Sequence, residues 1–345
     1  MKAKAIAVAL AALLAARGAQ ANGETTLAAQ NAQMLEHIAQ VHQYTPAQMD
    51  ELRTLLRRSG YMGQGNPAIT VHADTREACT ARVTEQSTEY ANPEFERLCG
   101  AKYMAPLYDP THERPTQARA CIDQFEFPDI PCEYPVVWVK ASEAAQVCTA
   151  VGKRLCDAHE WEGACEGALQ APDYPFDLAR GMTDGAAVAR MRAAHNQTYA
   201  SRARWSYGPE FKRGVCAQAG HKSASCEGDG WKHCGSNTYP AGDFPACRSP
   251  LGVYDLHGNA AEHMNLPLNP AQMASTGSTE LGVTEMKGSW FIFDTYRAHP
   301  DWCRWRAPYW HGGRVTDPHS HANYHLGFRC CKTVTPPVGP NLFGH

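Results

Sequence analysis

The sequence of 345 residues lacks the signatures of several common functional classes. It contains no Gly-rich phosphate loop, no helical His-Glu-x-x-His motif and no Ser-His-Asp order, so phosphate-binding, zinc-protease and serine-hydrolase sites are not indicated. Basic residues are not in excess, because 32 Lys and Arg stand against 35 Asp and Glu, and no basic stripe occurs. This argues against nucleic acid as the main partner. Beyond the N-terminus, no apolar run approaches the length of a membrane span.

Cysteine is absent from the first 78 residues and abundant after them, with 14 in total. This number is too high for a reducing cytosol unless the thiols bind metal, and it is even. The composition therefore predicts seven disulfides in an oxidising compartment.

The first residues predict export. Residues 1–21 combine a basic start at Lys2 and Lys4, an apolar run over residues 5–16 and a small-residue site ending at Ala21. This is the pattern of a signal peptide cleaved after Ala21, and the alternative is an uncleaved anchor. The apolar run is too short for a transmembrane helix. We therefore expect a periplasmic or secreted protein.

The segment 22–103 is predicted to precede the main domain. Apolar residues at helical spacing over 26–60 predict a helical hairpin. Thr45 and Gln48, around Pro46, match a capping box at the start of its second helix, and Gly60 stands where a C-terminal cap belongs.

Regular periodicity is weak in most of the remaining chain. The stretch 63–108 is turn-rich and carries Cys79 and Cys99, so a disulfide is expected to tie it. The stretch 141–165 is predicted to form one helix. The tract 167–251 is predicted to be irregular, so that disulfides or bound ions would organise it. Residues 336–345 are expected to form a tail.

Four separated segments carry a combination of motifs. They are Ile122–Pro128, with Ile-Asp-x-x-Glu; Ala144–Glu162, with Gly-Lys-Arg-Leu and Glu-Trp-Glu; Ser249–Glu262, with Gly-x-Tyr-Asp-x-x-Gly-Asn; and Gly288–Cys330, with Gly-Ser-Trp, Arg-x-Arg and Gly-Phe-Arg-Cys. In this order they resemble the formylglycine-generating enzyme family, the sulfatase-modifying factor domain. The resemblance implies an α+β domain over residues 104–335 with the complex C-type-lectin-like fold and little regular secondary structure. The N-terminal helical hairpin lies outside it.

The resemblance also implies a structural calcium ion. The matching family positions bind calcium through side chains at Asp255 and Glu262 and through the carbonyls of Gly258 and Ala260. Carboxylates and carbonyls around a tight turn are the oxygens that Ca²⁺ prefers. The alternative is a Gly-Asn turn with solvated carboxylates.

The catalytic part of the match fails. Formylglycine-generating enzymes hold Cu(I) with two cysteines, and the corresponding positions here are Ile292 and Trp302. Cys303 is adjacent to the second position, but a shift of one residue along a strand turns a side chain to the other face. Copper is therefore not expected. Ser289 and Arg306 remain from the usual neighbourhood and, with Cys303, are the weak catalytic candidates.

The family's disulfides imply two cysteine pairs. Cys148 would pair with Cys330. Cys165 normally pairs with a cysteine directly after Arg-x-Arg, where this chain has Ala307, so Cys303 is the nearest substitute. A reactive thiol at Cys303 is the alternative to a disulfide.

Histidines offer a different metal site. His319, His321 and His325 lie close together in the sequence, with Asp317 nearby. Imidazoles with a carboxylate suit Zn²⁺ or non-haem Fe²⁺. The alternative is a polar His-rich loop.

Two functional hypotheses remain open at this point. The first is an exported oxidoreductase of this superfamily whose chemistry has changed. The second is a non-catalytic, calcium- and disulfide-stabilised scaffold that binds a peptide, protein or small-molecule ligand. Fold alone does not decide between them.

Overall fold

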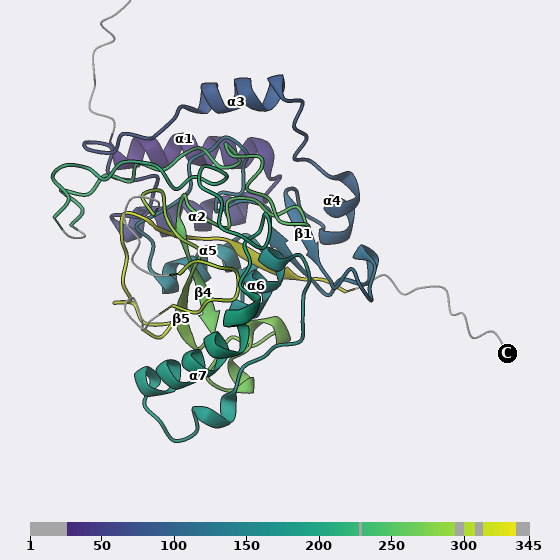
Figure 1. The fold of residues 1–345 in the computed structure, drawn as a ribbon. Helices are drawn as coiled ribbons and strands as arrows, with labels where there is room; N and C mark the ends of the chain where they lie inside the picture. Colours follow the sequence, from purple (N-terminus) through teal and green to yellow (C-terminus); the bar gives the residue numbers. More distant parts are fainter. Residues whose placement is uncertain (1–25, 228–229, 294–299, 308–312, 336–345) are drawn as a thin grey trace, which may run out of the picture.

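The computed structural model describes residues 26–227, 230–293, 300–307 and 313–335. In this part of the chain, seven α-helices and two small sheets are connected by long irregular segments, as Figure 1 shows. The α+β class and the low content of regular structure are as expected. The predicted signal peptide and the predicted tail lie outside the described residues. The helices are α1 Leu27–Val41, α2 Pro46–Ser59, α3 Arg76–Glu85, α4 Pro93–Cys99, α5 Ala141–Ala150, α6 Ala158–Glu166 and α7 Asp184–Tyr199.

Helices α1 and α2 form the predicted hairpin. The capping box at the start of α2 is confirmed, because Thr45 and Gln48 each bond the other's backbone amide. Gly60 ends the helix with a φ of 77°, a left-handed conformation in which a side chain would be strained. A hollow of about 680 Å³ lies between the two helices and is lined mainly by apolar side chains.

The inner side of this hairpin packs on the main domain. Met34, Ile38 and Leu52 are buried in one cluster with Phe127 and Phe328. At the end of α1, the His42 Nε2 lies 2.9 Å from the Pro128 carbonyl oxygen. The hairpin is thus part of the hydrophobic core and is fixed to it by both apolar and polar contacts.

Near the C-terminus, one continuous segment supplies a strand to each of the two sheets. One sheet has the order β1-β2-β7-β3 and is antiparallel; the other has the order β5-β4-β6, in which β6 is parallel to β4. Only Arg329 separates β6 from β7, so the chain passes directly from one sheet to the other. The strands are β1 Met104–Leu107, β2 Ala120–Asp123, β3 Arg154–Leu155, β4 Ala261–Leu266, β5 Val283–Lys287, β6 Leu326–Phe328 and β7 Cys330–Thr333.

Three local predictions need correction. The stretch 141–165 is not one helix: α5 ends before Gly152, whose φ is 74°, and the short strand β3 precedes α6. The tract 167–251 contains α7, an Ala-rich helix without a clear apolar stripe. The turn-rich stretch 63–108 contains α3 and α4, which are short.

Seven disulfides hold the irregular segments, and no cysteine is free. Two of them tie the 63–108 stretch to the rest of the domain, and two cross-link the tract 167–251. The pairs are Cys79–Cys132, Cys99–Cys121, Cys148–Cys330, Cys156–Cys331, Cys165–Cys303, Cys216–Cys247 and Cys226–Cys234. A set of disulfides of this size fits an extracellular or periplasmic protein.

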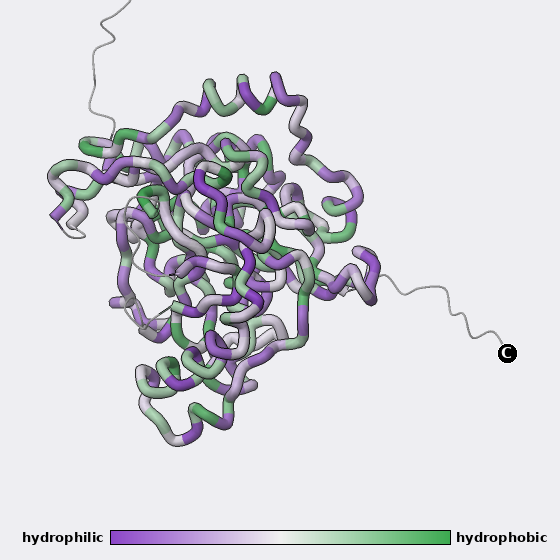
Figure 2. Tube along the Cα trace, in the orientation of Figure 1, coloured by the Kyte–Doolittle hydropathy of each residue, from purple (hydrophilic) through white to green (hydrophobic). Residues whose placement is uncertain are grey.

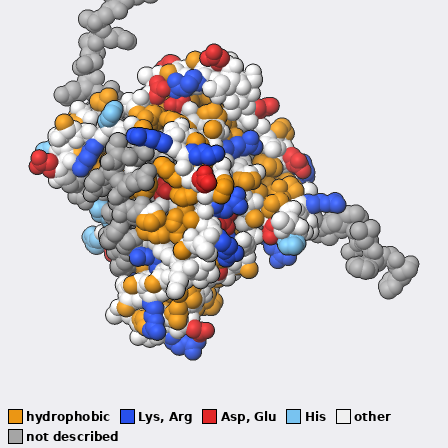
Figure 3. All heavy atoms as spheres, in the orientation of Figure 1, with side chains coloured by type: hydrophobic (Ala, Val, Ile, Leu, Met, Phe, Trp, Pro, Cys, Tyr) orange, Lys and Arg blue, Asp and Glu red, His pale blue; other side chains and the backbone are white. Residues whose placement is uncertain are grey.

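Hydrophobic and hydrophilic residues are interleaved in short stretches along the described trace (Figure 2). None of the described helices has the length and apolar character that a bilayer crossing requires. On the face drawn in Figure 3, hydrophobic side chains form separate patches among scattered basic and acidic ones.

Candidate functional site

The position of the first copper-binding cysteine is filled by apolar packing. Ile292 is 3% exposed and belongs to a cluster with Trp290, Phe291, Phe293 and Tyr324. The second position, Trp302, is only partly buried and precedes the disulfide-bonded Cys303. Neither side chain offers a thiolate, so these positions do not fit Cu(I).

Cys303 and Cys165 form a disulfide, as do Cys148 and Cys330. Cys148–Cys330 is the pair that the resemblance implied, and Cys165–Cys303 is the pair expected when Cys303 substitutes for the family's cysteine after Arg-x-Arg. Cys303 is therefore not a free thiol, which removes the simplest catalytic role proposed for it.

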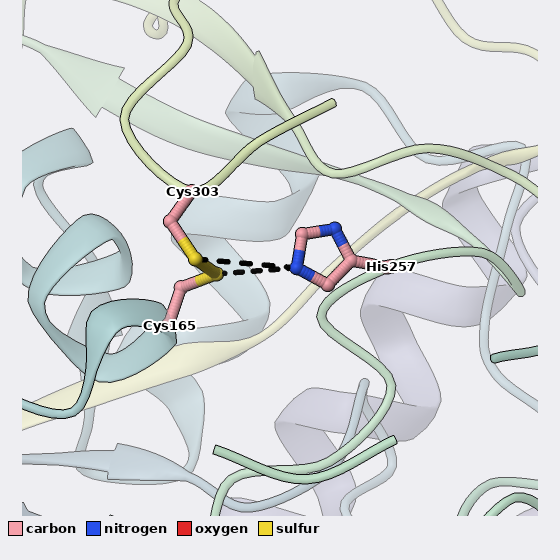
Figure 4. Close-up of side chains that lie close together, drawn as sticks. All are labelled: Cys165, His257 and Cys303. Atoms are coloured by element: carbon pink, nitrogen blue, oxygen red, sulfur yellow. Dashed lines mark hydrogen bonds between the residues drawn. A yellow bond between two sulfur atoms is a disulfide. The ribbon is translucent and has the colours of Figure 1, made fainter. Parts of the chain in front are cut away.

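A buried histidine faces this disulfide. The Nε2 of His257 lies 3.3 Å from the Sγ of Cys165 and 4.0 Å from the Sγ of Cys303, as Figure 4 shows. All three residues are fully buried. Because the Ser206 amide donates a hydrogen bond of 3.1 Å to Nε2, this nitrogen carries a lone pair and the proton is on Nδ1.

The other side of His257 faces an acidic network. Its Nδ1 lies 3.7 Å from the Oδ2 of Asp301, which is 4% exposed. Asp301 accepts hydrogen bonds from Trp205, Gln218 and Ser289, at 2.8, 2.9 and 2.9 Å. Burial tends to raise the pKa of Asp301, but these donors and the His257 ring outweigh burial and keep the pKa below its usual range.

Ser289 has no remaining hydrogen-bonding capacity. Its hydroxyl donates to Asp301 and accepts from the Gly258 amide at 2.9 Å and from the Gln218 side chain at 3.0 Å. A hydroxyl has one donor and two acceptor positions, and all are used. The geometry therefore assigns Ser289 a positioning role in the network, at 0% exposure.

Arg306 is held in a separate buried ion cluster. Its guanidinium donates to Glu162 at 2.9 and 3.1 Å and to Asp173 at 3.0 Å, and Lys287 donates to Glu162 at 3.1 Å. Burial alone would raise the pKa of Glu162, but the charges of Arg306 and Lys287 outweigh it and hold the pKa well below its usual range. Glu162 and Asp173 also lie near His195, but they are already paired with cations of the chain and do not form an open metal site.

The four residues implied for calcium are buried: Asp255, Gly258 and Ala260 lie in the turn before β4, and Glu262 lies at the start of β4. Asp255 is 2% exposed and accepts a hydrogen bond of 2.6 Å from the Gly242 amide. Glu262 forms a two-point pair with Arg329, at 2.6 and 2.7 Å. Glu126 is also fully buried and bonds the amide of Ala260 at 2.8 Å.

The charge balance at this turn fits a divalent cation. Three buried carboxylates, those of Glu126, Asp255 and Glu262, lie near the guanidinium of Arg329, which is the one guanidinium among the described residues that pairs with them. Burial raises the pKa of Asp255 to about 7, and burial with the neighbouring acids raises the pKa of Glu126. Buried carboxylates without a charged partner either bind protons or bind a cation. Asp255 is the better candidate ligand, because Glu262 is already paired with Arg329.

The three histidines proposed for zinc or iron do not form a cluster. His319 is exposed and His321 is partly buried, whereas His325 is buried and stacks on Trp290 with a centroid distance of 4.7 Å. Among the described residues, two groups of at least three His, Cys, Asp or Glu side chains bring their ligand atoms within 4.8 Å of one another. Neither group includes these histidines.

Sequence reasoning missed His257, Asp301 and Gln218. His257 lies inside the motif that suggested calcium. No sequence signal places it beside a disulfide between residues 138 positions apart.

An aromatic surface lies beside the filled copper position. Trp138, in the same cluster as Ile292, contacts Trp231 at a centroid distance of 5.1 Å, and Tyr61 lies 5.1 Å from Trp231. Tyr61 is 50% exposed, although most large apolar side chains in the described chain are buried. Trp231 is partly buried, and Trp138 beneath these two rings is only 4% exposed, so we call Tyr61 and Trp231 the aromatic surface.

Comparison with known proteins gives a clear family assignment. No curated protein matches the sequence. A solved structure titled "Crystal Structure of CarF" is similar at 13% sequence identity and a TM-score of 0.28, covering 77% of this chain and 85% of that chain. The profile of the sulfatase-modifying factor enzyme 1-like domain matches residues 81–334, beginning before residue 104, where the motifs placed the start. Since this match spans more than half of the sequence, the chain belongs to the sulfatase-modifying factor enzyme 1-like family.

Proposed function

We propose that this chain is an exported, disulfide-stabilised binding protein that recognises a polypeptide segment and has lost the copper-dependent oxidation of its family. The observation that carries the proposal is the burial of Ile292 in an apolar cluster at the position of a copper-binding cysteine. A second observation, the exposed Tyr61 beside that cluster, supports binding at the same place.

Export is supported by the disulfides and by the N-terminal sequence pattern. N-terminal sequencing of the protein from its native host tests it. We expect the mature chain to begin at Asn22, and an intact N-terminus on protein from the cytosol would contradict export.

Loss of copper chemistry is tested by three measurements on the mature protein. We expect no titratable thiol, no copper by elemental analysis and no aldehyde on a cysteine-containing peptide that formylglycine-generating enzymes oxidise. Bound copper together with aldehyde formation would overturn the proposal.

The proposed binding surface combines rigid aromatic rings with a disulfide-anchored loop. Trp231 lies in a loop whose ends meet at Cys226–Cys234, and its carbonyl accepts a hydrogen bond of 2.9 Å from the Asn66 side chain. Large aromatic side chains on such supports lose little conformational entropy on binding, which is why they dominate protein interfaces. An extended peptide with an apolar side chain is the ligand that fits this surface.

A displayed library of random peptides tests the binding proposal. We expect selection on the wild-type protein to enrich peptides that share an apolar residue. These should bind Trp231→Ala at least tenfold more weakly, since interface tryptophans contribute about 2 kcal/mol or more. Met182→Ala, which alters an exposed apolar residue in a different part of the chain, is the control. No enrichment, or equal binding to Trp231→Ala, would contradict the proposal.

We also propose a structural calcium ion at the buried turn. Asp255 and the carbonyls of Gly258 and Ala260 would hold it, and Glu262 would face it from its pair with Arg329. The ion would supply positive charge that neutralises buried carboxylates and would take no part in a reaction.

The oxidoreductase hypothesis is the second candidate, and His257 beside the Cys165–Cys303 disulfide favours it. Under this hypothesis Cys303 acts in thiol–disulfide exchange, whereas Ser289 and Arg306 position neighbouring groups. The 0% exposure of both sulfur-bearing residues weighs against exchange with a protein substrate. Oxidation of a dithiol peptide to its disulfide by the wild type, with the Cys165–Cys303 disulfide reduced to two thiols, and no such reaction in Cys303→Ser, would favour this candidate over the binding protein.

A further inference from the structure

The Cys165–Cys303 disulfide and His257 together contain a set of metal-ligand atoms. The two sulfurs and a ring nitrogen of His257 all lie within 4.8 Å of one another (Figure 4). Within the described chain, this is the one disulfide that forms such a set with a third His, Asp or Glu ligand. All three side chains are fully buried, so their geometry is fixed by the surrounding core.

The orientation of His257 is that of a metal-ligating histidine. Such histidines present one nitrogen to the metal and direct the other N–H towards a carboxylate, which fixes the tautomer and the ring. Here Nε2 faces the sulfurs, and Nδ1 faces Asp301 at 3.7 Å without a hydrogen bond. Asp301 is itself fixed by Trp205, Gln218 and Ser289.

Two further buried polar atoms near this set lack partners in the described structure. The hydroxyl of Ser206, whose amide contacts His257, has no hydrogen bond, and neither does the Oε1 of Gln218, whose amide nitrogen contacts Asp301. Buried polar atoms without partners are uncommon and indicate an absent water, ion or ligand.

We propose that the reduced form of this protein binds one Zn²⁺ ion through the thiolates of Cys165 and Cys303 and the Nε2 of His257. A dithiol reductant transfers two electrons and two protons to the disulfide and becomes a disulfide itself. The two resulting thiols release their protons when they bind zinc, and the metal replaces the Ser206 amide as the partner of Nε2. Two thiolates and an imidazole with an open fourth position match known zinc sites. The proposal does not depend on the peptide-binding function.

The proposal has a structural consequence for the disulfide. Because zinc binds only the reduced pair, it stabilises that pair and makes the disulfide easier to reduce. The Cys165–Cys303 pair would therefore exist either as a disulfide or as two thiolates bound to zinc.

The experiment uses the folded mature chain without oxygen. A phosphine reductant, which binds zinc only weakly, is added stepwise with and without Zn²⁺, and free cysteines are alkylated and mapped by mass spectrometry. We expect one zinc per chain and at least tenfold protection of Cys165 and Cys303 from alkylation, with the circular dichroism of the folded protein retained. Loss of the folded signal when this bond opens would overturn the proposal.

Two variants and a control identify the ligands. His257→Gln should lower zinc affinity at least 100-fold, and Asp301→Asn, which leaves every ligand in place, should lower it about 10- to 100-fold. His159→Gln alters another buried histidine, which is on the same helix as Cys165, and should bind zinc as the wild type does. Equal zinc binding by His257→Gln and the wild type would show that the metal is elsewhere and would contradict the proposal.

Discussion

Arg329 donates two hydrogen bonds to Glu262, at 2.6 and 2.7 Å, from the one position between β6 and β7. The same guanidinium also donates to the carbonyl oxygens of Asp123, Gln124 and Tyr254. Glu262 is in β4, and Asp123 ends β2. One side chain therefore connects both sheets to the loop that precedes β4.

Removal of this guanidinium should destabilise the whole domain. Arg329→Gln leaves the buried Glu262 carboxylate without its guanidinium partner, and breaking a buried pair in this way costs about 3–5 kcal/mol. We expect a corresponding fall in the free energy of unfolding, measured with urea. Arg314→Gln is the matched control, because Arg314 is 46% exposed and pairs with Asp184, and its loss should cost at most about 1 kcal/mol. Equal effects of the two variants would contradict the role of Arg329.

Glu285 should make the protein less stable as the pH rises. Burial raises its pKa from 4.5 to about 7, although Lys287 and the Ala307 amide act in the opposite direction. Between these two values the folded state binds more protons than the unfolded state, so stability falls with rising pH by up to about 1.4 kcal/mol per unit. Glu285→Gln should remove this dependence, so that its stability relative to wild type increases from pH 5 to pH 8. Glu89→Gln, at an exposed position, is the control.

His42 should have the opposite effect on the acid side. Burial, assisted by the charge of Lys153, lowers its pKa from 6.5 to about 3. Below pH 6.5 the unfolded chain takes up a proton at this residue and the folded chain does not. The free energy of unfolding therefore falls by up to about 1.4 kcal/mol per pH unit as the pH falls towards 3. Hydrogen exchange should therefore show faster opening of α1 at pH 4 than at pH 7. His42→Gln should reduce this difference between pH 4 and pH 7. His112→Gln, at an exposed position, should leave it unchanged.

Calcium should stabilise the protein more at pH 8 than at pH 5. Protons compete with the ion for Asp255, whose pKa is raised to about 7 by burial. We expect a chelator to lower the Tm at pH 8 by several degrees and to have a smaller effect at pH 5. Asp255→Asn should abolish the response, and Asp177→Asn, at a 90% exposed side chain, should keep it. A Tm that does not respond to the chelator at pH 8 would exclude calcium from this turn.

Local signals in the sequence predicted the elements that depend on local chemistry. The α1–α2 hairpin followed from the spacing of apolar residues and from the capping box at Thr45, and both are independent of the rest of the fold. The helix α7 was missed because its sixteen residues are rich in alanine and show no clear apolar stripe. Its buried residues, Ala187, Val188, Met191 and His195, do share one face, but alanines on all faces and a histidine on the buried one leave little contrast in the sequence.

The candidate site depends on contacts between distant residues, which the sequence does not display. The motifs identified the family and the replacement of the copper cysteines by Ile292 and Trp302. They did not reveal that Ile292 is buried among aromatic rings or that His257 lies between Asp301 and a disulfide. Such contacts follow from the packing of irregular segments, for which no repeating pattern exists.

Cys330 and Cys331 are consecutive in β7 and form disulfides with Cys148 and Cys156, so the strand is cross-linked on both of its faces. Their partners lie 182 and 175 residues earlier in the chain. Neither bond can form until the chain has been made as far as β7, and by then earlier cysteines have had time to pair wrongly with one another. Efficient biogenesis should therefore require a disulfide isomerase, and the yield of correctly folded protein should fall sharply in a host that lacks one.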